Sequence, residues 1–266
     1  MTSSTRQRFA LLPAGPGWLL NGWPRSVGIM QQVGFAQPCS GDDLAWLCAW
    51  AGRYGGSRGN RVALSALSKL TRVAARNGRS NHYHHAGHFA HVMMAAAMLA
   101  ARAGINPKER NLLILAALVH DLDHHGRRAK AYPLYKQERL SARLAGRILL
   151  RHSGDPRLVR RLERLIVATA LTSDPHREAI LASDPLARLL CDADVFASLF
   201  YDRGMALKIT GMLKLEQGLV GEAAALLDGF ATKMEADGLK SDAGRMLLRD
   251  LTASRQPRRN VVTGKG

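Results

Sequence analysis

Apolar residues recur with helical spacing over residues 61–254, and no segment there shows the strict alternation of a half-buried strand. The longest apolar runs are VMMAAAMLAA at 92–101 and LLILAALV at 112–119. Both are too short to cross a bilayer, so they predict buried helices of a globular core. With ordinary helix and loop lengths, this part of the chain would form roughly seven to nine helices. The pattern predicts an all-α, compact multi-helix domain.

Asn-Pro and Asp-Pro pairs mark where several helices should begin. Asn106-Pro107 supplies an N-cap and a proline at the first helical position, so a helix should run from there to about His120. Gly104 would close the preceding helix, which should begin near His84. Two further starts are predicted in the same way, at Asp155-Pro156 and Asp184-Pro185.

Composition divides the chain into three parts. Residues 1–60 are rich in Gly, Pro, Trp and Ser, which predicts a largely irregular N-terminal extension with one short helix around residues 43–52. Its faint basic-then-apolar start is broken by prolines and glycines, so we expect no signal peptide. Residues 61–254 form the predicted helical domain, and residues 255–266 are polar and basic, as in a flexible tail.

The chain has 266 residues and a formal net charge of +17. Such a charge can serve nucleic-acid or acidic-membrane binding, or it can belong to a solvated surface that steers small anionic substrates. The dispersed arginines and the aromatic content of 6% favour the second interpretation, so a nucleic-acid partner is not favoured. Three cysteines without CxxC spacing argue against a disulfide scaffold and favour a reducing, cytoplasmic location.

Eight of the ten histidines fall between His82 and His125. On a helix, His84, His88 and His91 would share one face, and His120-Asp121 would follow the apolar helix at 107–119. Imidazoles with carboxylates suit Zn²⁺, Mn²⁺ or Fe²⁺ at one position and Mg²⁺ or Mn²⁺ at a neighbouring one. A carboxylate can bridge two such metals, and a bridging water then becomes a hydroxide near neutral pH.

A later apolar segment, LLCDADVFASLF at 189–200, contains two aspartates, Asp192 and Asp194. Burying a carboxylate there without a partner would cost several kcal/mol, so a bound cation is the natural compensation. Either aspartate could complete the metal site on this argument.

Four segments resemble the HD-domain metal-dependent phosphohydrolases, and among them the catalytic domain of 3′,5′-cyclic nucleotide phosphodiesterases. The second segment is the most specific, because it follows the pattern HDxDHxG, and the resemblance covers about residues 60–235. It implies an all-α fold with a binuclear metal centre, and hydrolysis of a phosphoester by a metal-bridging hydroxide. The four segments are YHHAGH at 83–88, HDLDHHG at 120–126, IVAT at 166–169 with His176 downstream, and CDADV at 191–195.

The resemblance also implies individual roles. A first metal (Zn, or Fe or Mn) would be held by His88, His120, Asp121 and Asp194, with Asp194 preferred to Asp192 because Ala193-Asp194-Val195 fits the family pattern. Asp121 would bridge to a second metal (Mg or Mn). His84 would be the general acid that protonates the leaving oxygen. Side chains near the waters of the second metal would be His124, Glu138 and Thr169, and the substrate would contact Tyr83 and Phe230.

Departures from the family pattern bear on the substrate. His85 replaces an asparagine and His91 an aspartate, and Leu171 or its neighbours stand where an aspartate follows Ala-Thr. Leu227 occupies the position of the glutamine that grips the purine, although Asp228-Gly229-Phe230 is retained. The metal chemistry therefore looks conserved while base recognition differs, and the substrate, a small phosphorylated molecule or cyclic nucleotide, need not be cAMP or cGMP.

Two alternative hypotheses remain on the sequence alone. His152 and His176 could be extra metal ligands, as in cyclic-di-GMP or other nucleotide hydrolases and di-iron oxygenases. Their surroundings favour positions on the surface or behind the ligands. The chain could also be a basic nucleic-acid-associated protein with a vestigial metal site.

Overall fold

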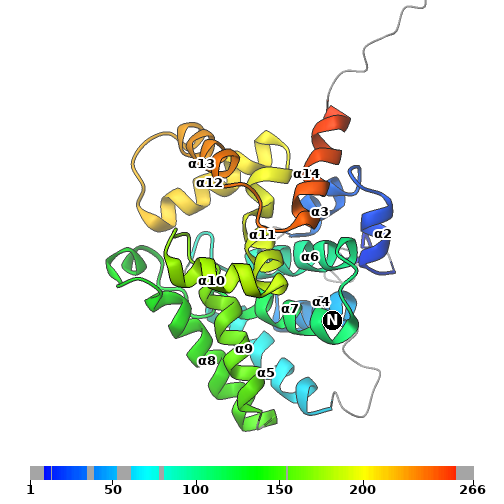
Figure 1. Ribbon diagram of the computed structural model, residues 1–266, viewed down its shortest axis with the longest axis vertical. Helices are drawn as coiled ribbons and strands as arrows, with labels where there is room; N and C mark the ends of the chain where they lie inside the picture. Colours follow the sequence, from blue (N-terminus) through cyan, green and yellow to red (C-terminus); the bar gives the residue numbers. More distant parts are fainter. Residues whose placement is uncertain are drawn as a thin grey trace, which may run out of the picture.

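The computed structural model describes residues 9–12, 14–34, 39–52, 61–77, 81–153 and 155–255, and all regular elements within these residues are helices (Figure 1). The predicted all-α fold class is confirmed. The helices are α2 (Pro16–Asn21), α3 (Val27–Gly34), α4 (Gly41–Gly52), α5 (Arg61–Asn77), α6 (Ala86–Arg102), α7 (Pro107–Val119), the 3-10 helix η2 (Gly126–Ala131), α8 (Lys136–Ser153), α9 (Pro156–Val167), α10 (Pro175–Ser183), α11 (Pro185–Phe200), α12 (Arg203–Gln217), α13 (Ala223–Asp237) and α14 (Asp242–Arg255).

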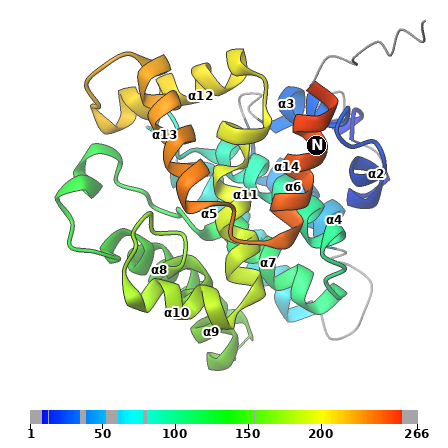
Figure 2. The same cartoon turned by 45° about the horizontal axis from the view of Figure 1, so that its top comes forward.

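Helix α6 forms the centre of the molecule. Its first fifteen residues are all buried, and α2, α3, α4, α7 and α11 pack around it (Figure 1). Burying a helix on every side requires an almost wholly apolar surface, which explains why the run at 92–101 shows no polar face. On the outer side of α11 lie α12, α13 and α14 (Figure 2). Helices α6, α7 and α11 therefore meet inside the core. Helix α6 begins and α7 ends next to the histidine-rich segments, whereas Asp194 lies in the interior of α11.

All three predicted helix starts are confirmed, and each has the expected cap. The Asn106 side chain accepts a hydrogen bond from the Glu109 backbone N–H at 3.0 Å. The Asp155 carboxylate accepts from the first turn of α9, and the Asp184 carboxylate accepts from Leu186 N at 3.0 Å. A cap satisfies backbone N–H groups that have no partner within the helix, so it defines where the helix begins.

The prediction of a largely irregular extension over residues 1–60 was wrong for the part that the structure describes. Helices α2, α3 and α4 pack on α6 and bury Leu19, Met30, Leu44 and Leu47 completely. Glycines and prolines in this region separate short helices, and the apolar residues between them are core positions. Only the helix around residues 43–52 was predicted, and α4 begins slightly before it. Residues 1–8, 13, 35–38 and 53–60 lie outside the described residues.

The helix count over the main domain was also underestimated. The described residues between 61 and 255 form ten α-helices, α5 to α14. The predicted tail at 255–266 lies outside the described residues except for Arg255, which is the last residue of α14.

No helix in the described part of the chain is both long and apolar enough to cross a membrane. No disulfide joins Cys39, Cys48 and Cys191, and all three thiols are buried.

Candidate metal centre

The turn before α6 places His84, the first histidine of the centre. His85 is the N-cap of α6, and its Nδ1 accepts a hydrogen bond from Gly87 N at 3.0 Å. His84 therefore precedes the helix, and the prediction that His84, His88 and His91 share a helix face was wrong. The His91 Nδ1 lies 2.5 Å from the Tyr201 hydroxyl in the core. Only His88 enters the metal centre from α6 itself.

The end of α7 orients His120. Its Nδ1 lies 3.0 Å from the carbonyl oxygen of Ala117. A carbonyl can only accept, so Nδ1 carries the hydrogen and donates, which leaves the lone pair on Nε2. That tautomer is the one in which a metal-binding histidine is held by a second protein group.

Four side chains from α6, the α7 end and α11 converge on one point. His120 Nε2 lies 3.2 Å from His88 Nε2, 3.1 Å from Asp121 Oδ2 and 3.3 Å from Asp194 Oδ1. One donor atom from each of the four residues lies within 4.8 Å of all the others. Two imidazole nitrogens and two carboxylate oxygens at this spacing fit a divalent cation such as Zn²⁺, Mn²⁺ or Fe²⁺.

The electrostatics of the cluster agree with a cation site. Both histidines are fully buried. Burial alone would raise the pKa of Asp121, yet the His120 imidazole next to it holds that pKa well below its ordinary value. Burial would lower the pKa of His120, but Asp121 and Asp194 raise it well above the ordinary value. The Asp121 and Asp194 carboxylates are therefore stabilised by positive charge at this point, and a metal ion would supply such charge.

A second group of donors shares Asp121 with the first. One atom each of His84, Asp121 and His124 lie within 4.8 Å of one another. The His84 and His124 rings stack with their centroids 3.6 Å apart, and His84 Nε2 lies 3.5 Å from Asp121 Oδ2. Asp123, which has φ +60°, turns the chain between Asp121 and His124. Asp121 thus lies where a ligand common to two cations would lie.

Glu216 of α12 organises this second group, and the sequence did not reveal it. Its Oε2 accepts from Tyr83 N at 2.7 Å and His84 N at 2.9 Å. Its Oε1 contacts His84 Nδ1 and lies 3.3 Å from His124 Nδ1. Burial would raise the pKa of Glu216, but the hydrogen bonds with the two histidines lower it. More than 130 residues separate Glu216 from His84, so no local spacing could have predicted the contact.

Comparison with protein families supports the same interpretation. Residues 86–199 match the HD domain family model. These residues form an HD domain. The segment belongs to the HD-domain superfamily of metal-dependent phosphohydrolases, as the sequence motifs predicted, and it contains all four residues of the first cluster. No curated protein matches the chain.

Asp192 has a different task from Asp194 in the HD domain. Its carboxylate accepts hydrogen bonds from Lys240 N at 2.7 Å, Ser241 N at 2.8 Å and Ser241 Oγ at 2.5 Å. These donors lie directly before α14, so the buried Asp192 ties that helix to α11. Of the two aspartates, Asp194 alone contacts the clustered histidines. The preference for Asp194 as the candidate ligand therefore agrees with the geometry.

We expect Asp192→Ala to lower the free energy of unfolding by about 2–4 kcal/mol, because three donors beside a buried helix start would lose their acceptor. Denaturant unfolding measures this loss. The matched control is Asp237→Ala, which removes an exposed carboxylate from the same region and should leave the free energy of unfolding close to that of the wild type. Metal content should be the same in both variants. Loss of metal from Asp192→Ala at unchanged stability would show that Asp192 is a ligand.

Two cavities reach the metal centre. One of about 460 Å³ is lined by Asp121, His124 and Glu138, and burial raises the pKa of Glu138. The other, of about 270 Å³, is lined by Asp194, Thr169 and Phe230. The sequence candidates Glu138, Thr169 and Phe230 are thus brought to the centre, and their roles stay predictions.

Two of the residues predicted from the sequence, Tyr83 and Thr169, have contacts that bear on their roles. The Tyr83 ring is buried and packs on the His84 and His88 rings, with centroids 4.7 and 4.6 Å apart. The Thr169 hydroxyl donates its hydrogen to the Ile166 carbonyl oxygen at 2.8 Å. Toward the cavity it can therefore act as a hydrogen-bond acceptor. Substrate binding by Tyr83 stays a prediction.

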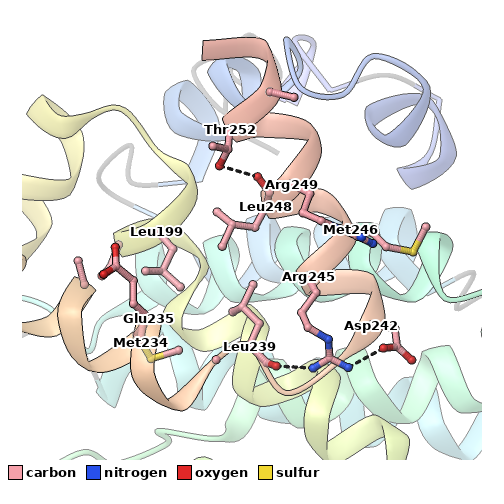
Figure 3. Close-up of a pocket in the computed structure, with 14 residues that line it drawn as sticks. Leu199, Met234, Glu235, Leu239, Asp242, Arg245, Met246, Leu248, Arg249 and Thr252 are labelled. Carbon is pink, nitrogen blue, oxygen red and sulfur yellow. Dashed lines mark hydrogen bonds and ion pairs between the residues drawn. The ribbon is translucent and has the colours of Figure 1, made fainter. Parts of the chain in front are cut away.

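A larger groove of about 1070 Å³ lies elsewhere, between α11, α13 and α14. Figure 3 shows its side chains, with Leu199 and Met234 facing Leu248 across the groove and Arg245 held by Asp242 and the Leu239 carbonyl. None of the clustered histidines or aspartates lines it. The groove is therefore separate from the metal centre.

His152 and His176 lie outside the clusters found among the described residues. His152 Nδ1 lies 3.1 Å from the Ser65 hydroxyl on the exposed side of α8. The His176 ring packs edge-on against Tyr135 with centroids 5.7 Å apart. The hypothesis of extra histidine ligands, on which the di-iron and cyclic-di-GMP alternatives depend, finds no support in this arrangement.

Proposed function

We propose that the chain is a metal-dependent phosphohydrolase that cleaves a phosphoester with a water nucleophile, most simply a 3′,5′-cyclic nucleotide phosphodiesterase or a close relative. One observation carries the proposal: the Asp121 carboxylate belongs both to the group with His88, His120 and Asp194 and to the group with His84 and His124. A shared carboxylate is the arrangement that holds two cations close together.

His88, His120, Asp121 and Asp194 would hold the first cation (Zn, or Fe or Mn). Asp121, with His124 and Glu138 near its waters, would hold the second (Mg or Mn). Bound together, two divalent cations ionise a water near neutral pH and neutralise charge on the phosphoryl oxygens. The carboxylates and the neutral imidazoles supply the negative charge and the lone pairs that such cations need.

We propose that His84 protonates the leaving oxygen. Its Nδ1 contacts the Glu216 carboxylate, which can only accept, so Nδ1 carries a hydrogen. In the imidazolium form Nε2 carries a second hydrogen and faces the Asp121 side of the centre, 3.5 Å from Oδ2. When the bond between phosphorus and the leaving oxygen breaks, that oxygen would take the proton from Nε2.

Fewer residues of this chain match those with which the family recognises the organic part of its substrate. Leu227 is buried in α13, so no amide side chain at this position can grip a purine. Phe230 lines the cavity that contains Asp194. A small phosphorylated substrate agrees with the positive charge of the chain, which attracts anions. We therefore propose a cyclic nucleotide or similar ester with a base preference unlike that of cAMP or cGMP enzymes.

A panel of phosphate esters tests the proposal. Cyclic mononucleotides and bis(p-nitrophenyl) phosphate are incubated with the protein and Mn²⁺, Mg²⁺ or Zn²⁺. We expect metal-dependent hydrolysis of bis(p-nitrophenyl) phosphate and of at least one cyclic mononucleotide, abolished by EDTA. Absence of hydrolysis by protein that has been shown to bind the metal would refute the proposed function.

We expect Glu216→Gln to move the alkaline limb of the kcat profile to lower pH. Burial lowers the pKa of His84, while Asp121 and Glu216 raise it. Removing the charge of Glu216 removes one raising influence, so the protonated form of His84 is lost at a lower pH and the rate declines earlier. The profile is measured with a cyclic mononucleotide, whose leaving alkoxide needs the proton.

Glu222→Gln is the matched control, because Glu222 is an exposed acid next to α13 whose side chain caps nothing. Its profile should match that of the wild type. A Glu216→Gln profile with the wild-type alkaline limb would show that Glu216 does not act on His84.

A further inference from the structure

The smaller cavity beside the metal centre leads from Asp194 to a group of basic side chains. Its lining includes Asp194 and Cys191 of α11, together with three cations, Arg177 of α10, Lys233 of α13 and Lys240 after it. Phe230 contributes an apolar wall. A cavity that joins a metal cluster to three cations has the charge pattern of a site for a molecule with two anionic groups.

Arg177 is the deepest of the three cations, with an exposed fraction of 6%. Its Nε donates to the Ala168 carbonyl oxygen at 2.9 Å, and one Nη donates to the Thr172 carbonyl oxygen at 3.1 Å. The other Nη has the Cys191 sulfur at 4.0 Å as its contact among the described residues. Sulfur is a weak acceptor, so a buried guanidinium nitrogen at this cavity is poorly satisfied.

The acids that line the cavity are engaged by other groups. Asp237 pairs with Lys233 at 2.9 Å, whereas the Lys240 ammonium donates to the backbone carbonyl oxygen of Asp237 at 3.2 Å. The Lys240 ammonium therefore hydrogen-bonds a neutral oxygen. Its charge also helps to lower the pKa of the Asp237 carboxylate, but that carboxylate is paired with Lys233, so Lys240 can still bind an anion. Of the remaining acids, Glu178 pairs with Arg177 and Asp192 accepts from the residues before α14. Asp194 contacts the clustered histidines.

Helix geometry limits how far the second anion lies from the metals. Cys191 and Asp194 are three residues apart on α11, which is a rise of about 4.5 Å along the helix axis. Cys191 touches Arg177, and Asp194 belongs to the metal cluster. An anion beside Arg177 and a phosphate at the metals would therefore be separated by only a few bonds. Two phosphates on one sugar have such a separation.

We infer that this cavity binds a second anionic group of the substrate, so that the enzyme prefers compact organic phosphates with two phosphate groups. The inference rests on the proposed function, because the first phosphate is placed at the metals. Arg177 and Lys240 would hold the second phosphate, and Phe230 would contact the organic part between them.

Competitive inhibition of bis(p-nitrophenyl) phosphate hydrolysis tests the inference. Adenosine 3′,5′-bisphosphate is compared with adenosine 3′-monophosphate and adenosine 5′-monophosphate, in Mn²⁺, for the wild type and two variants. We expect the bisphosphate to inhibit at a concentration about tenfold or more below either monophosphate. Lys240→Gln should reduce this preference at least about threefold. Among the described residues the Lys240 ammonium hydrogen-bonds one backbone carbonyl oxygen near the surface, so we expect the variant to fold.

The matched control is Arg249→Gln, which removes one positive charge from the separate groove of Figure 3. It should keep the wild-type preference and the wild-type rate. Equal inhibition by all three nucleotides, or a preference that falls in Arg249→Gln rather than in Lys240→Gln, overturns the inference while the proposed function stands. Failure to hydrolyse bis(p-nitrophenyl) phosphate with any metal overturns the proposed function, and the inference with it.

Discussion

Asp121→Ala should abolish turnover, with any residual kcat on the order of 10³-fold or more below the wild type. Asp121 is the residue common to both donor groups, so its loss removes a ligand from each proposed cation at once. It also removes the carboxylate that faces His84. The measurement is kcat for bis(p-nitrophenyl) phosphate with Mn²⁺, after confirming by circular dichroism that the variant is folded.

Asp123→Asn is the appropriate control for this variant. Asp123 lies in the same motif, but its side chain is more than half exposed and belongs to neither donor group. Asparagine tolerates the positive φ of this position as aspartate does, so the turn should persist. We expect kcat within about threefold of the wild type, the scale of an ordinary surface substitution. Turnover by Asp121→Ala comparable with that of Asp123→Asn would contradict the bridging role.

His84→Ala should slow the hydrolysis of esters with poor leaving groups by about 10²- to 10⁴-fold, which is the usual contribution of a general acid. Esters with activated leaving groups should be slowed much less, because p-nitrophenolate departs without a proton. The comparison is between a cyclic mononucleotide and bis(p-nitrophenyl) phosphate at saturating metal. The metal held by the first cluster should be unchanged, since that cluster does not include His84.

His82→Ala serves as the control, because His82 is exposed and lies two residues before His84. Both substrates should be hydrolysed at wild-type rates by this variant. Equal slowing of the two ester classes in His84→Ala would exclude the general-acid role and leave His84 as a residue that only shapes the centre.

Local chemistry made much of the fold predictable. Caps such as Asn106 and Asp184 act over two or three residues, so the sequence shows them directly, and the structure has both. The apolar runs at 92–101 and 112–119 became the buried helices α6 and α7 for the same reason. The N-terminal helices were missed because short helices between glycines and prolines acquire their stability from packing on α6, which no local pattern records.

The metal centre shows the same division between local and tertiary information. His88, His120, Asp121 and Asp194 were predicted from their motifs, and the structure brings them together. Asp192 and Asp194 are two residues apart, so on a helix they point about 200° apart and cannot share a site. The burial argument could not choose between them, whereas the resemblance to the family favoured Asp194. The structure adds the task of Asp192, which binds the residues before α14. Glu216 was absent from every motif because it approaches from α12 through tertiary contacts.

Metal binding at equilibrium tests the central claim most directly. Wild-type protein and Asp194→Asn are dialysed against excess Mn²⁺, and bound metal per chain is determined by elemental analysis. The central claim is that imidazoles and carboxylates from α6, the α7 end and α11 converge on two cations. It predicts about two ions per wild-type chain and fewer in the variant. Wild-type protein without a bound divalent ion, or a variant that binds as much metal as the wild type, would contradict it.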